Sequence, residues 1–199
     1  MAWTAERIAQ RIVDAFRPRD LPGGDPIFLS TSYEVDTQTL ERLARQGSWI
    51  DLGHEVLCEN PLALAFMTPD AFAWFLPAYL LVSVIGYSES GLTSTIITCL
   101  TPPDEADSVR FQTLVDETAE LDQDLLVEEP QPVSLGTDDK LVELFTERFA
   151  SLSLDQKAAV RDYLEYIDAA HGEDFPVFGP KQALDRYWAR VPRSTEEQS

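Results

Sequence analysis

The sequence predicts an all-α fold, namely a single-domain, irregular helical bundle around one buried central helix over residues 69–85. The stretch from Ala71 to Ile85 contains no charged residue, and a helix that is apolar on nearly every face is a buried one. Several flanking segments repeat apolar residues at spacings of three and four, which is the helical period. The chain has 199 residues with an apolar fraction of 44%, which is enough for one globular core.

The central helix has a clear start signal and one irregular position. Thr68 can cap the helix through its side-chain oxygen, and Pro69 suits the first helical position, where a missing N–H costs nothing. Pro77 cannot donate a hydrogen bond to the carbonyl group of Ala73, which costs roughly 3 kcal/mol inside a helix. We therefore expect a kink or a break at Pro77. A membrane span needs about 20 apolar residues, so this shorter run is read as a buried core helix.

Three segments before the central helix are predicted to be helical. Residues 4–16 carry one apolar stripe, residues 36–46 begin with a capping Asp, and residues 49–58 end at an Asn-Pro pair. The short apolar run at 27–29 could be extended, but the residues that follow it offer no partner strand.

The segment after the central helix is less regular. Residues 92–100 are rich in Thr and Ile, so strand and helix compete; the length and neighbours of this segment favour a helix. From about residue 104 to 136 the chain is acidic and irregular, which is typical of a surface segment.

The last third gives clear helix signals. Thr137 or Asp138 caps a helix that runs to about Ala150, and Ser153 with Gln156 forms a capping box at the start of another helix, which stops at Gly172. A final helix opens at Pro180. The tail over 193–199 is predicted to be disordered.

The net charge of −20 is concentrated in the middle of the chain. Between Gly47 and Asp139 there are 17 acidic residues and one basic residue, Arg110, which gives −16 of the −20. Such a field repels nucleic acid and anionic lipid and favours basic protein surfaces or cations. Solubility alone is an equally good explanation of the acidity.

These charges lead to a functional hypothesis of a non-enzymatic, acidic protein-binding module. A protein of this kind docks on a basic partner, as an inhibitor or a toxin-neutralising (immunity-type) protein does, without direct contact to nucleic acid or membrane. The residues expected to contact the partner are Asp116, Glu117, Glu120, Asp122, Asp124, Glu128 and Glu129.

No catalytic residue, metal or cofactor is predicted. His54 and Cys58 are four residues apart and could share a helix face with Cys99 and His171 nearby, but no recognised metal-ligand spacing is present. The alternative hypothesis is a small-ligand-binding protein or enzyme whose pocket forms at the Pro77 break and uses His54, Glu55 or Tyr79. A weaker alternative is a nucleic-acid mimic.

The N-terminus lacks the apolar core of a signal peptide, and the two cysteines lie in apolar surroundings. Both observations predict a cytoplasmic protein with reduced thiols.

The central stretch Phe66-Met-Thr-Pro-Asp-Ala-Phe-Ala-Trp-Phe-Leu-Pro-Ala-Tyr-Leu resembles the signature of an uncharacterised bacterial domain family. Members of that family read Phe-Leu-Thr-Pro-Glu-Ala-Phe, then two aromatic residues, then Leu-Pro-Ala; here Met67 and Asp70 replace the usual Leu and Glu. The resemblance extends from Asp36 to Trp188, except for the acidic middle. It implies a fold, but no activity, cofactor or catalytic residue.

Overall fold

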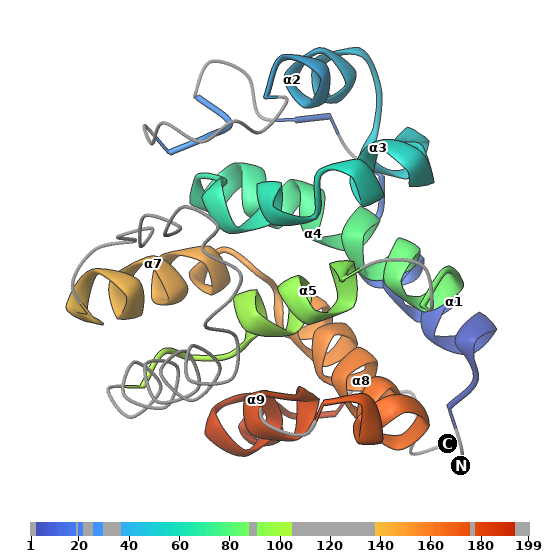
Figure 1. The fold of residues 1–199 in the computed structure, drawn as a ribbon, viewed down its shortest axis with the longest axis vertical. Helices are drawn as coiled ribbons and strands as arrows, with labels where there is room; N and C mark the ends of the chain where they lie inside the picture. The colour runs from blue at the N-terminus through green and yellow to red at the C-terminus, as the bar shows by residue number, and fades with distance from the viewer. Residues whose placement is uncertain are drawn as a thin grey trace, which may run out of the picture.

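The computed structural model describes residues 3–18, 20–21, 26–29, 37–87, 91–104, 138–175 and 178–193. These residues form helices and no strand, apart from one isolated bridge, so the predicted all-α class is confirmed (Figure 1). The elements in chain order are α1 (Ala5–Ala15), α2 (Thr37–Gln46), η1 (Trp49–Asp51), α3 (His54–Glu59), η2 (Pro61–Phe66), α4 (Pro69–Ile85), α5 (Leu92–Leu100), α7 (Asp138–Ala150), α8 (Leu154–His171), η3 (Gly172–Asp174), α9 (Pro180–Arg186) and η4 (Trp188–Arg190).

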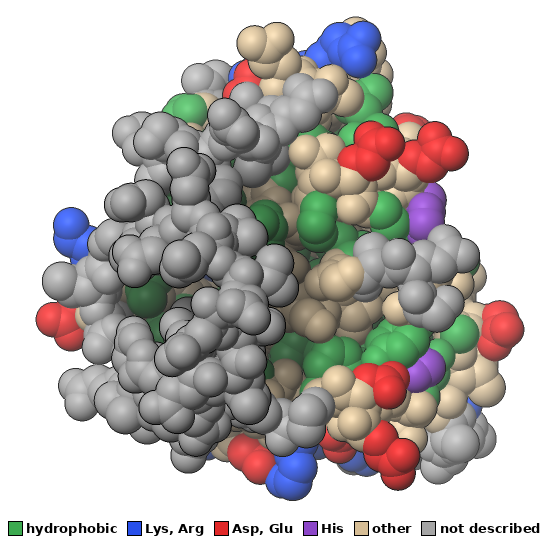
Figure 2. Space-filling model, viewed as in Figure 1, with side chains coloured by type: hydrophobic (Ala, Val, Ile, Leu, Met, Phe, Trp, Pro, Cys, Tyr) green, Lys and Arg blue, Asp and Glu red, His purple; other side chains and the backbone are tan. Residues whose placement is uncertain are grey.

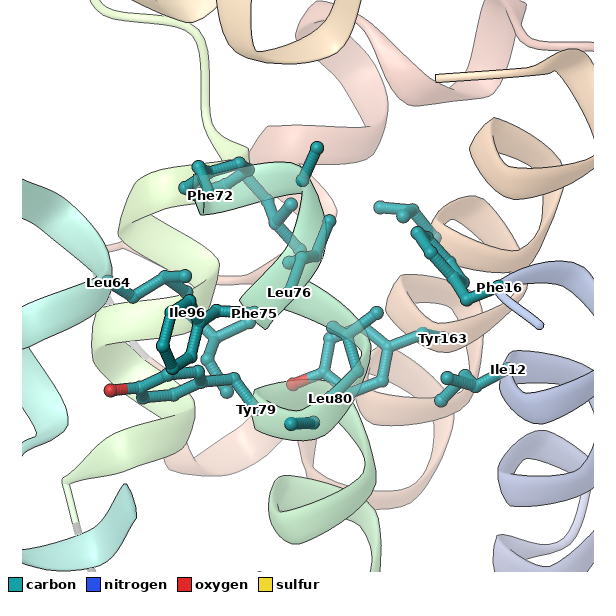
Figure 3. Close-up of a cluster of buried hydrophobic side chains, with 14 of the residues drawn as sticks. Ile12, Phe16, Leu64, Phe72, Phe75, Leu76, Tyr79, Leu80, Ile96 and Tyr163 are labelled. Atoms are coloured by element: carbon teal, nitrogen blue, oxygen red, sulfur yellow. The ribbon is translucent and has the colours of Figure 1, made fainter. Parts of the chain in front are cut away.

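Helix α4 is the centre of the core, as its sequence predicts. It packs against α1, α5 and α7, while α8 packs against α1 and α9. Figure 3 shows Phe72, Leu76 and Leu80 of α4 in one cluster of buried side chains that also contains Ile12 of α1. These four side chains are fully buried, and burying each one stabilises the fold by roughly 1.5–3 kcal/mol.

Pro77 does not interrupt this helix. Helix α4 is continuous from Pro69 to Ile85. Of the two expected irregularities at Pro77, the break is therefore wrong, and the kink stays a prediction. The missing hydrogen bond to Ala73 is offset because almost every side chain of α4 is buried.

The start of α4 differs from its predicted form. Thr68 has the extended backbone of a capping residue, but its side chain makes no capping bond. The hydroxyl group donates instead to the carbonyl oxygen of Pro26, at 3.0 Å. Beside it, Phe28 forms an antiparallel bridge with Met67. The run at 27–29 therefore has a partner, which the sequence did not reveal, because that partner is about 40 residues away.

Residues 49–58 were predicted to form one continuous helix, and this prediction is wrong. They form two separate elements, η1 and α3. Leu52 and Gly53 adopt extended conformations and separate η1 from α3. Glycine loses more conformational freedom in a helix than any other residue, which disfavours a helix through this position.

The remaining helices follow their sequence signals. Residues 92–100 are helical, and α7 begins at Asp138, which agrees with Thr137 as the preceding residue, and ends at Ala150. Ser153 and Gln156 form the predicted capping box, with N–O distances of 2.9 and 3.2 Å. Helix α8 ends before Gly172, and α9 opens at Pro180.

Three buried hydroxyl groups join the central helices to each other. The Ser83 hydroxyl oxygen lies 2.9 Å from that of Thr93 and 2.8 Å from that of Tyr163. All three residues are buried, and they come from α4, α5 and α8 respectively. Within the described residues, no helix is long and apolar enough to cross a membrane.

Candidate functional site

The predicted partner-binding acids lie outside the described residues. This holds for all of Asp116, Glu117, Glu120, Asp122, Asp124, Glu128 and Glu129. Their role stays a prediction. The described part of the same acidic region includes α3 and the start of α4.

Exposed carboxylates gather on α3 and at the start of α4. Leu57 anchors α3 in the core, which leaves Glu55 and Glu59 exposed one turn apart on the outer side, and Asp70 is exposed as well. Figure 2 shows acidic side chains, in red, over α3 beside a histidine, in purple. Like charges at this spacing destabilise a helix by about 0.2–0.5 kcal/mol. No ion pair with another described residue offsets that repulsion.

Several acids of the first and last helices are paired with cations. Among the described residues, their closest ion pairs are Arg11–Asp155 at 2.7 Å, Arg11–Asp162 at 3.2 Å, Arg161–Glu165 at 2.9 Å, Lys181–Asp185 at 2.6 Å and Arg193–Glu165 at 3.1 Å. In the acidic middle, Asp104 pairs with Arg186 at 3.5 Å. Within the described residues, the carboxylates of Glu55, Glu59 and Asp70 therefore have no cation paired with them.

An open groove lies where the end of α8 and η3 face α9. It encloses about 680 Å³. Its lining combines Phe175 with the carboxylates of Asp168, Glu173 and Asp185. Lys181 bonds to Asp185, and this hydrogen bond is the main cause that raises the pKa of Lys181. Lys181 and Arg186 line the groove as well, so its surface is of mixed charge and partly apolar.

An aromatic and carboxylate cluster lies beside this groove. The rings of Tyr87 and His171 stack with their centroids 3.5 Å apart. The Tyr87 hydroxyl donates to Asp174 at 2.8 Å, and His171 Nδ1 lies 4.0 Å from the same carboxylate. Loss of solvent around the ring and the bond to Asp174 raise the pKa of Tyr87, so its hydroxyl stays a donor. No sequence pattern indicated this cluster, because Tyr87 lies in a turn more than 80 residues from its partners.

The three residues of the predicted Pro77 pocket have different surroundings among the described residues. Tyr79 is fully buried, and its hydroxyl donates to the carbonyl oxygen of Asn60 at 2.9 Å. Burial raises the pKa of Tyr79, so the hydroxyl remains protonated. Glu55 points away from the core as an exposed side chain. His54 instead contacts Cys58, at 3.7 Å.

No group of three or more His, Cys, Asp or Glu side chains is placed to hold a metal ion within the described ranges. The sequence analysis considered four possible metal ligands, and two of them, His54 and Cys58, are in contact. His171 is stacked on Tyr87.

Comparison with known proteins gives one match. The model of a family of unknown function, DUF6714, matches residues 6–121, which is more than half of the chain. The chain belongs to this family. The match includes the central motif of α4 and the acidic middle up to Leu121, whereas the last part of the resemblance, as far as Trp188, lies beyond it. No curated protein and no solved structure matches the chain.

Proposed function

We propose that this DUF6714 protein is a non-enzymatic, acidic protein-binding module whose partner is a basic protein. An inhibitor or a toxin-neutralising (immunity-type) protein of a bacterium is the form of this function that we favour. The observation that carries the proposal is the charge of −16 between Gly47 and Asp139. It persists as exposed carboxylates without described ion pairs on α3 and at Asp70.

Unpaired charges of one sign do not stabilise a fold, but they accelerate association with a protein of opposite charge. Surface ion pairs contribute only about 0–1 kcal/mol to stability, and unpaired like charges contribute repulsion. A field of one sign raises the rate of encounter with a protein of opposite charge by about 10- to 1000-fold at low salt. The acids at 116–129 would then occupy a cationic surface of the partner.

Charge reversal tests this proposal. Glu117, Glu120, Asp122 and Asp124 are changed together to Lys, and the association rate with a basic protein that the wild type captures is measured at low salt. We expect a fall of at least about tenfold, since steering by charge is worth that much or more. An unchanged rate contradicts docking through these acids.

A matched control separates local charge from total charge. Reversal of the exposed acids Asp20, Glu143, Glu147 and Glu173 also changes the net charge from −20 to −12. We expect this control to slow association less than the first variant does. Equal slowing would assign the effect to net charge alone and would remove the acidic segment as the docking site.

The two alternatives differ in what they require. The ligand-binding or enzymatic alternative needs an open pocket at Pro77, and the buried Tyr79 with its hydroxyl bonded to Asn60 does not favour one. A nucleic-acid mimic would bind a partner that DNA displaces, so competition with duplex DNA distinguishes it from the proposed module. We also infer a cytoplasmic location, because Cys58 and Cys99 do not form a disulfide with each other.

A further inference from the structure

Helix α5 and the segment η2 form a surface without charge. Residues 60–69 and 91–103 contain no charged side chain, although charged residues make up 25% of the chain. The two elements contact each other, and their exposed side chains are Leu62 of η2 and Ser94 and Thr98 of α5. Figure 2 shows hydrophobic and other uncharged atoms, in green and tan, over α5 in the middle of the view. We refer to residues 60–69 and 91–103 as the α5–η2 face.

Buried side chains hold the backbone of η2 at both ends. At its start, the Tyr79 hydroxyl donates to the carbonyl oxygen of Asn60 at 2.9 Å. At its end, the guanidinium group of Arg148 donates to the carbonyl oxygen of Ala65 at 2.7 Å. Both donors are buried, whereas Leu62 between these two ends is 48% exposed. An apolar side chain on a fixed backbone loses little conformational freedom when a partner covers it, which favours binding.

Unpaired carboxylates border the α5–η2 face. Glu59 lies just before η2 in the chain, and Asp70 lies just after it. Both side chains are exposed, and no cation among the described residues pairs with either of them. The core of a protein interface is depleted in charged residues, and its rim is polar. An uncharged centre with acids at its border is therefore complementary to a protein surface that has an apolar centre and basic residues around it.

We propose that the α5–η2 face is the surface on which the basic protein partner docks. An apolar part of the partner covers Leu62, and its Lys or Arg side chains pair with Glu59 and Asp70. This inference rests on the proposed function and adds a second role to it. The acids at 116–129 set the rate of encounter, because long-range charge acts mainly on association, whereas contacts at the centre of an interface act mainly on dissociation.

Two pairs of variants test the face. L62S removes the exposed apolar side chain, and L154S is its control, because Leu154 at the start of α8 is 71% exposed and lies outside the face. T98E places a carboxylate on the face, and T146E on α7 is its control. Both threonines are exposed, and each hydroxyl donates to the carbonyl oxygen four residues earlier, at 2.9 and 2.8 Å. The members of each pair therefore differ in position and not in the kind of change.

The dissociation rate is measured from the basic protein whose association rate tests the proposed function. We expect L62S and T98E to raise this rate at least about fivefold, as the loss of a contributing interface residue does. L154S and T146E should leave it within about twofold, as surface changes elsewhere do. Poly-L-lysine, which is a cation without an apolar surface, is the second probe, and all four variants should bind it as the wild type does. The T98E result is informative because added negative charge does not slow association with a basic protein.

Several results would overturn the proposal. Dissociation of L62S and T98E at the rates of their controls would remove the face as the docking surface, and the charge-reversal result would still stand for the proposed function. Weakening toward poly-L-lysine as large as toward the protein would also overturn it. If the wild type binds no basic protein, the proposed function and this inference both fall. Two variants at separate positions keep the test valid where circular dichroism shows that one of them disturbs the fold.

A second copy of the chain is the other occupant that the experiment distinguishes. Sedimentation equilibrium of the wild type alone should show a monomer, since two copies of charge −20 repel each other. A dimer that T98E dissociates and T146E retains would assign the α5–η2 face to self-association and would overturn the basic partner as its occupant.

Discussion

Removal of the Ser83 hydroxyl is expected to destabilise the fold more than removal of either hydroxyl that it contacts. Ser83 is the middle member of the buried network, 2.9 Å from the Thr93 hydroxyl and 2.8 Å from the Tyr163 hydroxyl. In Ser83→Ala, both neighbours lose this partner, and each unsatisfied buried hydroxyl costs about 1–3 kcal/mol. The expected loss is therefore about 2–6 kcal/mol. In Tyr163→Phe, Ser83 keeps its bond to Thr93, so the expected loss is about 1 kcal/mol.

Urea unfolding followed by far-ultraviolet circular dichroism measures these differences. The urea concentration at the unfolding midpoint should be highest for the wild type, lower for Tyr163→Phe and lowest for Ser83→Ala. The slope of the unfolding free energy against urea concentration should be the same in all three. Ser94→Ala is the control, since Ser94 is exposed on α5 and a surface change there should stay within about 0.5 kcal/mol. A loss in Ser83→Ala no larger than that in Tyr163→Phe would refute the reasoning.

Two further predictions concern charges in the fold. Arg11→Met should cost roughly 3 kcal/mol in the same assay, because Asp162 is buried and loses a cation at 3.2 Å, while the exposed Asp155 contributes little; a loss below about 1 kcal/mol would contradict this. Burial raises the pKa values of Tyr79 and Tyr163 above the ordinary value of about 10. Their stabilisation is therefore complete below pH 10, where both states keep the proton, and is lost as the pH rises beyond it. The melting temperature should fall above pH 10, and by less in Tyr163→Phe; a constant melting temperature from pH 9 to 11 would be inconsistent with the two buried hydroxyls.

Local signals were sufficient to predict most of the helices. The uncharged run of α4 and the capping box at Ser153 depend on neighbours within four residues, and both are in the structure where the sequence places them. The role of Thr68 was wrong because its hydroxyl bonds to Pro26, more than 40 residues away. The break at Pro77 was also wrong, because burial of the surrounding side chains keeps the helix continuous.

The candidate sites show the same division between local and distant information. The contact between His54 and Cys58 follows from their spacing of four residues. The stack of Tyr87 on His171 could not be predicted, since it depends on how the end of α4 meets the end of α8. The acidic region was recognised by counting charged residues, and such a count does not show where the carboxylates lie relative to one another.

The salt dependence of association tests the central claim most directly. The rate at which the wild-type protein binds its captured basic partner is measured from about 20 to 500 mM NaCl, a range over which the Debye length shortens from roughly 20 Å to below 5 Å. Docking through the acidic region predicts a steep fall in the association rate with salt and a much weaker dependence in the variant reversed at Glu117, Glu120, Asp122 and Asp124. A rate that is independent of salt, or a partner without a basic surface, would contradict the proposed function.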